Sequence, residues 1–79
     1  MTKTIRKGEK MKISARNQLK GKVEKVIMGA INAEVIIRTS GGETIVSIVT
    51  KESVESLGLV EGKEVYAVVK ASNVMVAVD

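Results

Sequence analysis

The stretch TKESVESLG at residues 50–58 decides the fold. Its threonine can cap a helix, glutamates follow in the first turns, and its final glycine can end the helix. Val54 and Leu57 stand three residues apart and supply one apolar face. The stretch therefore predicts a helix of about two turns.

Strand patterns flank this helix on both sides. Runs rich in Val and Ile, in which apolar and polar residues partly alternate, predict five strands, over 18–28, 33–39, 44–49, 64–70 and 74–78. Gly21 predicts a bend in the first strand. Gly41 and Gly42 predict a hairpin between the second and third, because consecutive glycines can adopt the positive φ of tight turns.

Three strands, a short helix and two more strands is the element order of an OB-type barrel. The predicted fold class is all-β, a five-stranded OB-like Greek-key barrel with one short helix between strands 3 and 4. The competing fold is an SH3-like barrel, which would not need that helix. The helix therefore favours the OB-like barrel.

The composition predicts one small domain that gains burial by self-association. The chain has 79 residues, of which 44% are apolar, and this is near the size at which a single core barely stabilises itself. It contains no Cys and no His, so neither a disulfide nor a zinc site of the usual kind can stabilise the fold. We expect a homo-oligomer.

The charge is concentrated at the N-terminus. Residues 1–10 hold four basic residues and one acidic one, whereas 11–79 hold nine basic and eight acidic residues. We interpret 1–10 as a disordered basic arm or extension and 11–79 as a single ligand-binding domain. Because this domain is nearly neutral, its ligand should be small and held by focused contacts.

Several functions are disfavoured by what the sequence lacks. Without His or Cys, and with its only Asp at the C-terminus, the chain has no usual catalytic set and no direct protein ligands for a metal, so we expect no enzyme. It has no apolar run long enough for a membrane or a signal peptide, which predicts a cytoplasmic protein without a membrane partner. One Tyr and no Phe or Trp leave no stacking platform for nucleic acid.

An anion is the ligand that the polar clusters favour. Residues 14–19 (SARNQL) place a hydroxyl, a guanidinium and a carboxamide within four positions, although such a cluster is also typical of a polar turn or the start of a strand. Thr50 and Ser53 place two hydroxyls at the positive end of the predicted helix, or simply cap it. Lys70 ends the fourth strand, where a lysine is ordinarily just solvated.

Together these segments resemble the Mop or molbindin family of small molybdate-binding proteins. The resemblance runs from about residue 12 to residue 78. It is carried by 14–21 (SARNQLKG), 47–53 (SIVTKES), 57–59 (LGL) with Gly62, and 67–75 (AVVKASNVM). The first and last of these segments are specific to the family. The resemblance implies an OB-like barrel, a hexamer built from three dimers that exchange strands, and oxyanions held between subunits.

The resemblance also implies which residues bind. Those from one subunit would be Ser14, Ala15 and Arg16, and those from its neighbour Thr50, Ser53, Lys70 and Ala71, with Ser72 as a substitute for Ala71, which offers only its backbone N–H. A second site is implied at the turn formed by Gly29, Ala30, Ile31, Asn32 and Ala33.

The implied function is intracellular storage or homeostasis of molybdate, with tungstate as a second ligand because it has nearly the same size, charge and shape. Two other readings stay open. One is an OB-type module for single-stranded nucleic acid that uses the basic arm. The other is a regulatory or scaffold domain detached from a larger transporter or regulator.

Overall fold

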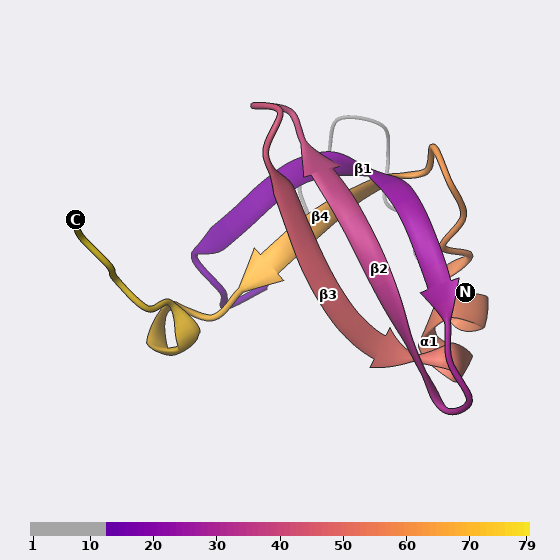
Figure 1. Ribbon diagram of the computed structural model, residues 1–79. Helices are drawn as coiled ribbons and strands as arrows, with labels where there is room; N and C mark the ends of the chain where they lie inside the picture. The colour runs from indigo at the N-terminus through magenta and orange to yellow at the C-terminus, as the bar shows by residue number, and fades with distance from the viewer. Residues whose placement is uncertain (1–12) are drawn as a thin grey trace, which may run out of the picture.

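The computed structural model describes residues 13–79, so the predicted arm at 1–10 lies outside the described part. The elements run β1 (Asn17–Met28), β2 (Asn32–Thr39), β3 (Thr44–Thr50), α1 (Lys51–Leu57) and β4 (Glu64–Val69), with a short 3-10 turn, η1 (Ala71–Asn73), after the last strand (Figure 1). The all-β class and the short helix between the third and fourth strands are confirmed.

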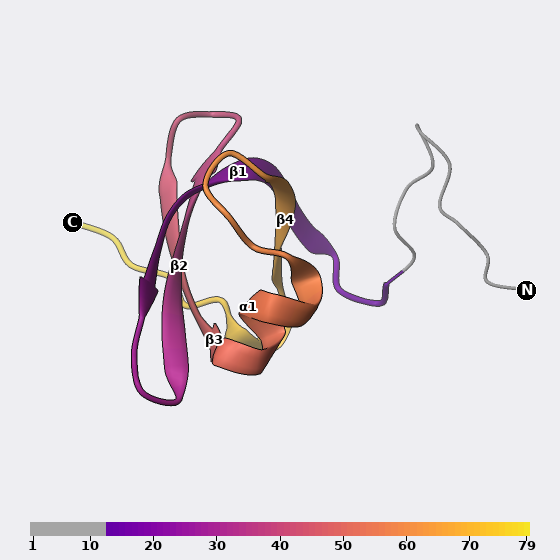
Figure 2. The same cartoon turned by 90° about the vertical axis from the view of Figure 1, so that its right-hand side faces the viewer.

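One curled antiparallel sheet, in the order β3-β2-β1-β4, forms the body of the fold. The long strand β1 is shared between two neighbours. Its first half pairs with β4, from Asn17 opposite Val69 to Lys22 opposite Glu64, and the part from Gly21 to Met28 pairs with β2. This sharing curls the sheet into the open OB-like shape that Figures 1 and 2 show, with α1 at one end.

The irregularity in β1 lies close to the predicted bend. Pairing with β2 shifts register between Val23 and Lys25, so the bulge falls at Glu24 and not at Gly21. Gly21 is buried where β2 and β4 both pair with β1, and a Cβ there would lie 2.4 Å from the Arg38 carbonyl oxygen. Glycine is therefore needed at this position for the close approach of two backbones.

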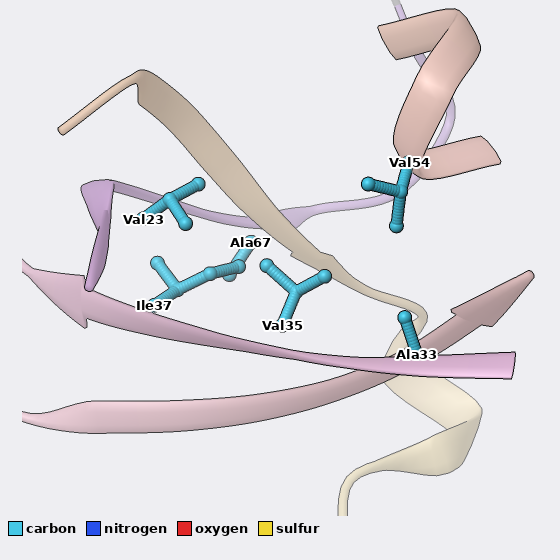
Figure 3. Packing of buried hydrophobic residues seen from close by; sticks show 6 residues of the cluster. All are labelled: Val23, Ala33, Val35, Ile37, Val54 and Ala67. Atoms are coloured by element: carbon cyan, nitrogen blue, oxygen red, sulfur yellow. The ribbon is translucent and has the colours of Figure 1, made fainter. Parts of the chain in front are cut away.

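The core is small and aliphatic. Its buried side chains come from β1, β2, β4 and α1. They are Val23, Ala33, Val35, Ile37, Val54 and Ala67 (Figure 3). Alternate residues of β2 point into it, as the period of a half-buried strand requires. The partly buried Ile45 and Val49 of β3 pack against its rim.

Local capping explains why α1 forms where the sequence predicted it. The Thr50 side chain accepts a hydrogen bond from the Ser53 N–H at the N-terminus. Gly58, with φ of 63°, adopts the left-handed conformation and its N–H donates to the last turn. The Lys63 Nζ adds a bond to the Leu57 carbonyl, at 2.7 Å.

The prediction of a fifth strand over 74–78 is wrong for the single chain. Within residues 13–79 the sheet has four strands, and residues 74–79 extend away from it after η1 (Figure 1). Met75 is 93% exposed and Val76 is 89% exposed. An apolar segment of this kind becomes a strand only when a neighbouring strand completes its hydrogen bonds, and within the described residues this segment has no such neighbour. No helix among the described residues has the length and apolarity needed to cross a membrane.

Candidate functional site

An open groove lies where β1 begins and β4 ends. The pair Asn17 and Val69 is the last of the β1–β4 ladder, and beyond it the two segments separate into facing walls. One wall carries Ser14, Ala15 and Arg16, and the other Lys70, Ala71 and Ser72, with Ile13, Val68 and Asn73 completing the lining. Six of the eight predicted oxyanion residues therefore meet in this groove, although they are separated by more than fifty positions in sequence.

The groove combines positive charge with hydrogen-bond donors. Arg16 and Lys70 come from opposite walls, and Ser14 and Ser72 add hydroxyl groups to the same lining. None of the described residues that line the groove is acidic. A guanidinium and an ammonium group only donate hydrogen bonds, and hydroxyl groups can donate as well, so this set of groups suits an anion.

Thr50 and Ser53 do not reach this groove within the chain. Thr50 pairs with Asn32 at the other end of the sheet, and Figure 1 shows α1 and η1 on opposite sides of the molecule. The two residues bond to each other: the Thr50 hydroxyl donates to Ser53 Oγ at 2.9 Å and accepts from Ser53 N at 3.0 Å. Their first role in the chain is to cap α1.

The predicted second site is the tip of the β1–β2 hairpin. The Gly29 N–H donates to the Asn32 carbonyl at 2.8 Å and closes the turn. Ile31 is exposed, but the Ala33 side chain is part of the core and faces away from solvent. The turn offers backbone groups and an apolar tip, without a charged side chain of its own.

The carboxamides of Asn17 and Gln18 brace the groove. Both belong to the polar cluster at 14–19, but neither was among the predicted oxyanion-binding residues. Asn17 Nδ2 donates to the Val69 carbonyl at 3.1 Å, across the two walls. Gln18 Nε2 donates to the Ala15 carbonyl at 2.9 Å, within one wall. Their position directly after Arg16 could have indicated a role near the site. The hydrogen-bond partner of Asn17, however, is 52 residues away and could not be deduced from spacing in the sequence.

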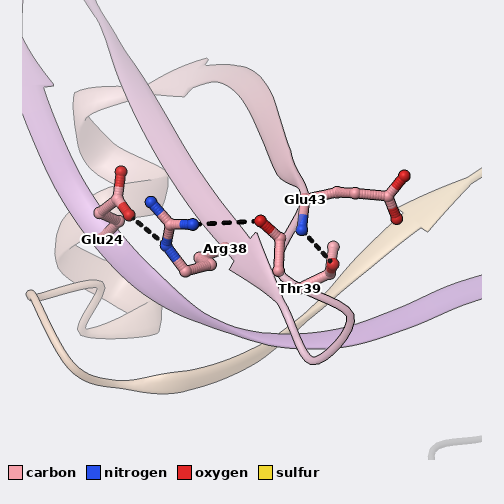
Figure 4. Close-up of polar contacts among 5 residues, drawn as sticks. Glu24, Arg38, Thr39 and Glu43 are labelled. Carbon is pink, nitrogen blue, oxygen red and sulfur yellow. Dashed lines mark hydrogen bonds and ion pairs between the residues drawn. The ribbon is translucent and has the colours of Figure 1, made fainter.

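A second polar cluster, outside the groove, serves the β2–β3 hairpin. Arg38 pairs with Glu24 and donates to the Gly42 carbonyl at 3.1 Å, while the Glu43 N–H donates to the Thr39 hydroxyl (Figure 4). Gly42 supplies the positive φ that the hairpin needs. The Arg38 guanidinium therefore bonds to groups of the fold itself. No group of three metal-ligating side chains occurs in residues 13–79.

Known proteins match nearly the whole described chain. The TOBE domain matches residues 13–76. Molybdenum-pterin-binding protein 3 of Clostridium pasteurianum is 50% identical over 66 residues, which cover 84% of this chain and 97% of that protein. The chain belongs to the molbindin family. The resemblance drawn from the sequence is therefore confirmed.

Solved molbindin structures share the fold as well as the sequence. MopII from Clostridium pasteurianum superposes with a TM-score of 0.81 at 51% identity, covering 85% of this chain and 100% of that one. The cytoplasmic molybdate-binding protein ModG, in a crystal form with molybdate bound, gives 0.79 at 51% identity and covers 82% of this chain. The match spans 46% of the ModG chain. The OB-like fold is confirmed by these neighbours.

Proposed function

We propose that this molbindin is a non-enzymatic protein that binds molybdate, and tungstate with it, and stores the oxyanion inside the cell. The proposal rests on one observation: Arg16 and Lys70 converge in a groove that serine hydroxyls also line. None of the described residues that line this groove is acidic. The names of the relatives and the molybdate-bound ModG support the choice of anion.

Molybdate suits such a groove for electrostatic reasons. It is a tetrahedral dianion whose four oxygens only accept hydrogen bonds at neutral pH, so its site needs donors and about two positive charges. Arg16 and Lys70 provide the charges. Ser14, Ser72 and the backbone N–H groups of Ala15 and Ala71 provide donors. Tungstate presents nearly the same charge and shape and should bind similarly.

We propose that a neighbouring subunit completes the site. The groove opens to solvent, and the hydroxyls of Thr50 and Ser53 lie elsewhere in the same chain. A second copy that brings its Thr50 and Ser53 to the groove would enclose the anion. This modifies the division that the resemblance implies, because Lys70 and Ala71 then belong to the same chain as Arg16.

The C-terminal segment gives the means of assembly. The strands β3 and β4 are the two edges of the open sheet, and the space between them is lined mostly by apolar side chains, among them Val35, Ile37, Val49 and Val68. Residues 74–78 are apolar and uncharged, and they extend away from the sheet. We propose that two copies exchange these segments, each as the fifth strand of its partner, and that three such dimers form the hexamer.

Calorimetric titration of the purified protein tests the proposed ligand. We expect molybdate and tungstate to bind and sulfate, which is smaller, to bind more weakly. Because the ligand binds only the folded state, molybdate at 100 times its Kd should add about 2.7 kcal/mol to the free energy of unfolding and raise the Tm. Absence of both heat and a Tm shift with molybdate would refute the proposed function.

A further inference from the structure

A carboxamide lies at the point where the two walls of the groove separate. Asn17 is the first residue of β1 and pairs with Val69, the last residue of β4. Its half-buried side chain donates from Nδ2 to the Val69 carbonyl oxygen at 3.1 Å. The side chain therefore adds a cross-strand bond at the last pair of the ladder.

The residues next to this bond carry the charges of the groove. Arg16 directly precedes Asn17, and Lys70 directly follows Val69. The ends of a strand pair open more easily than its centre, because fewer bonds hold them. The turn η1 that follows Lys70 has no side-chain cap at its N-terminus. The separation of Arg16 and Lys70 thus depends on how firmly the last pair is held.

Gln18 braces only one wall. Its Nε2 donates to the Ala15 carbonyl, three residues away, so this bond folds the Ser14–Arg16 segment without linking it to β4. Of the two carboxamides, Asn17 alone links β1 to β4.

We propose that Asn17 is a positioning residue of the oxyanion site. Its carboxamide fixes the spacing between Arg16 and Lys70 at which one tetrahedral dianion can bond to both, and it does so through Val69 without contacting the anion. The inference rests on the proposed function, which identifies the anion that the spacing serves.

Asn17→Ala, compared with Ser40→Ala, tests this role. The control removes a similar bond, since Ser40 Oγ donates to the Lys20 carbonyl of the same strand at 3.1 Å, outside the groove lining. One hydrogen bond is worth about a two- to tenfold change in affinity. We expect Asn17→Ala to weaken molybdate binding by that factor and to lower the preference for molybdate over sulfate, with strand content unchanged. Ser40→Ala should bind like the parent.

Amide hydrogen exchange of the ligand-free proteins gives a second measurement. Asn17→Ala should speed exchange at Asn73 and Val74, whose N–H groups donate to the Lys70 and Ala71 carbonyls, and Ser40→Ala should not. Parent-like affinity in Asn17→Ala would overturn the positioning role while leaving the proposed function intact. If the parent itself does not bind molybdate, the proposed function fails. The exchange rates then decide separately whether Asn17 holds the walls together, and unchanged rates would overturn that role.

Discussion

Arg16→Ala is expected to weaken molybdate binding about 10- to 100-fold, because it removes a charged donor from one wall of the groove. The sheet should remain intact, since the Arg16 side chain is exposed and contributes nothing to the core. Lys70→Ala should have a similar effect from the opposite wall. Titration calorimetry with molybdate measures both losses, and circular dichroism checks the strand content.

Arg38→Ala is the matched control for the loss of a guanidinium. Arg38 pairs with Glu24 and the β2–β3 hairpin and does not line the groove. This variant should keep the parent affinity for molybdate even if its Tm falls. If Arg16→Ala bound molybdate as tightly as Arg38→Ala, the groove would not be the oxyanion site.

Deleting residues 74–79 is expected to leave single chains in place of the proposed hexamer. The apolar space between β3 and β4 would lose the segment proposed to fill it, and burial of each valine side chain is worth about 1.5–3 kcal/mol. The shortened chain should also lose molybdate binding, because the neighbour's hydroxyls would no longer reach the groove. Light scattering measures the mass, and titration measures the binding.

Deletion of Asp79 alone is the control for this truncation. It removes the only charged residue of the segment and leaves its apolar residues in place. We expect this variant to keep the parent mass and affinity. If the protein lacking 74–79 kept the parent mass, the proposed exchange of C-terminal segments would be wrong.

The sequence could predict α1 because the information for it is local. Thr50 and Gly58 cap the helix within nine residues, and both caps form as expected. The fifth strand could not be judged in the same way. The valines of 74–78 indicate that the segment favours an extended conformation, but a strand forms only beside a partner, and among residues 13–79 of the single chain this segment has none.

The candidate site shows the same division between local and long-range information. The residue types of 14–19 suggested an anion and the family resemblance added 70–72, but only the pairing of Asn17 with Val69 brings the two segments together. Thr50 and Ser53 have the same donor chemistry, yet the cap that they form lies at another part of the sheet. Spacing in the sequence could not show which donors lie in the groove and which do not, because this depends on the pairing register of strands that are far apart in the chain.

On the proposed mechanism, molybdate is held between copies of this chain. Native mass spectrometry of the protein with molybdate tests it most directly, because mass and bound ligand are read from the same ion. We predict that molybdate appears only on assemblies of more than one chain, with the hexamer as the main species. Single-chain ions that carry molybdate, or assemblies that bind none, would contradict the claim.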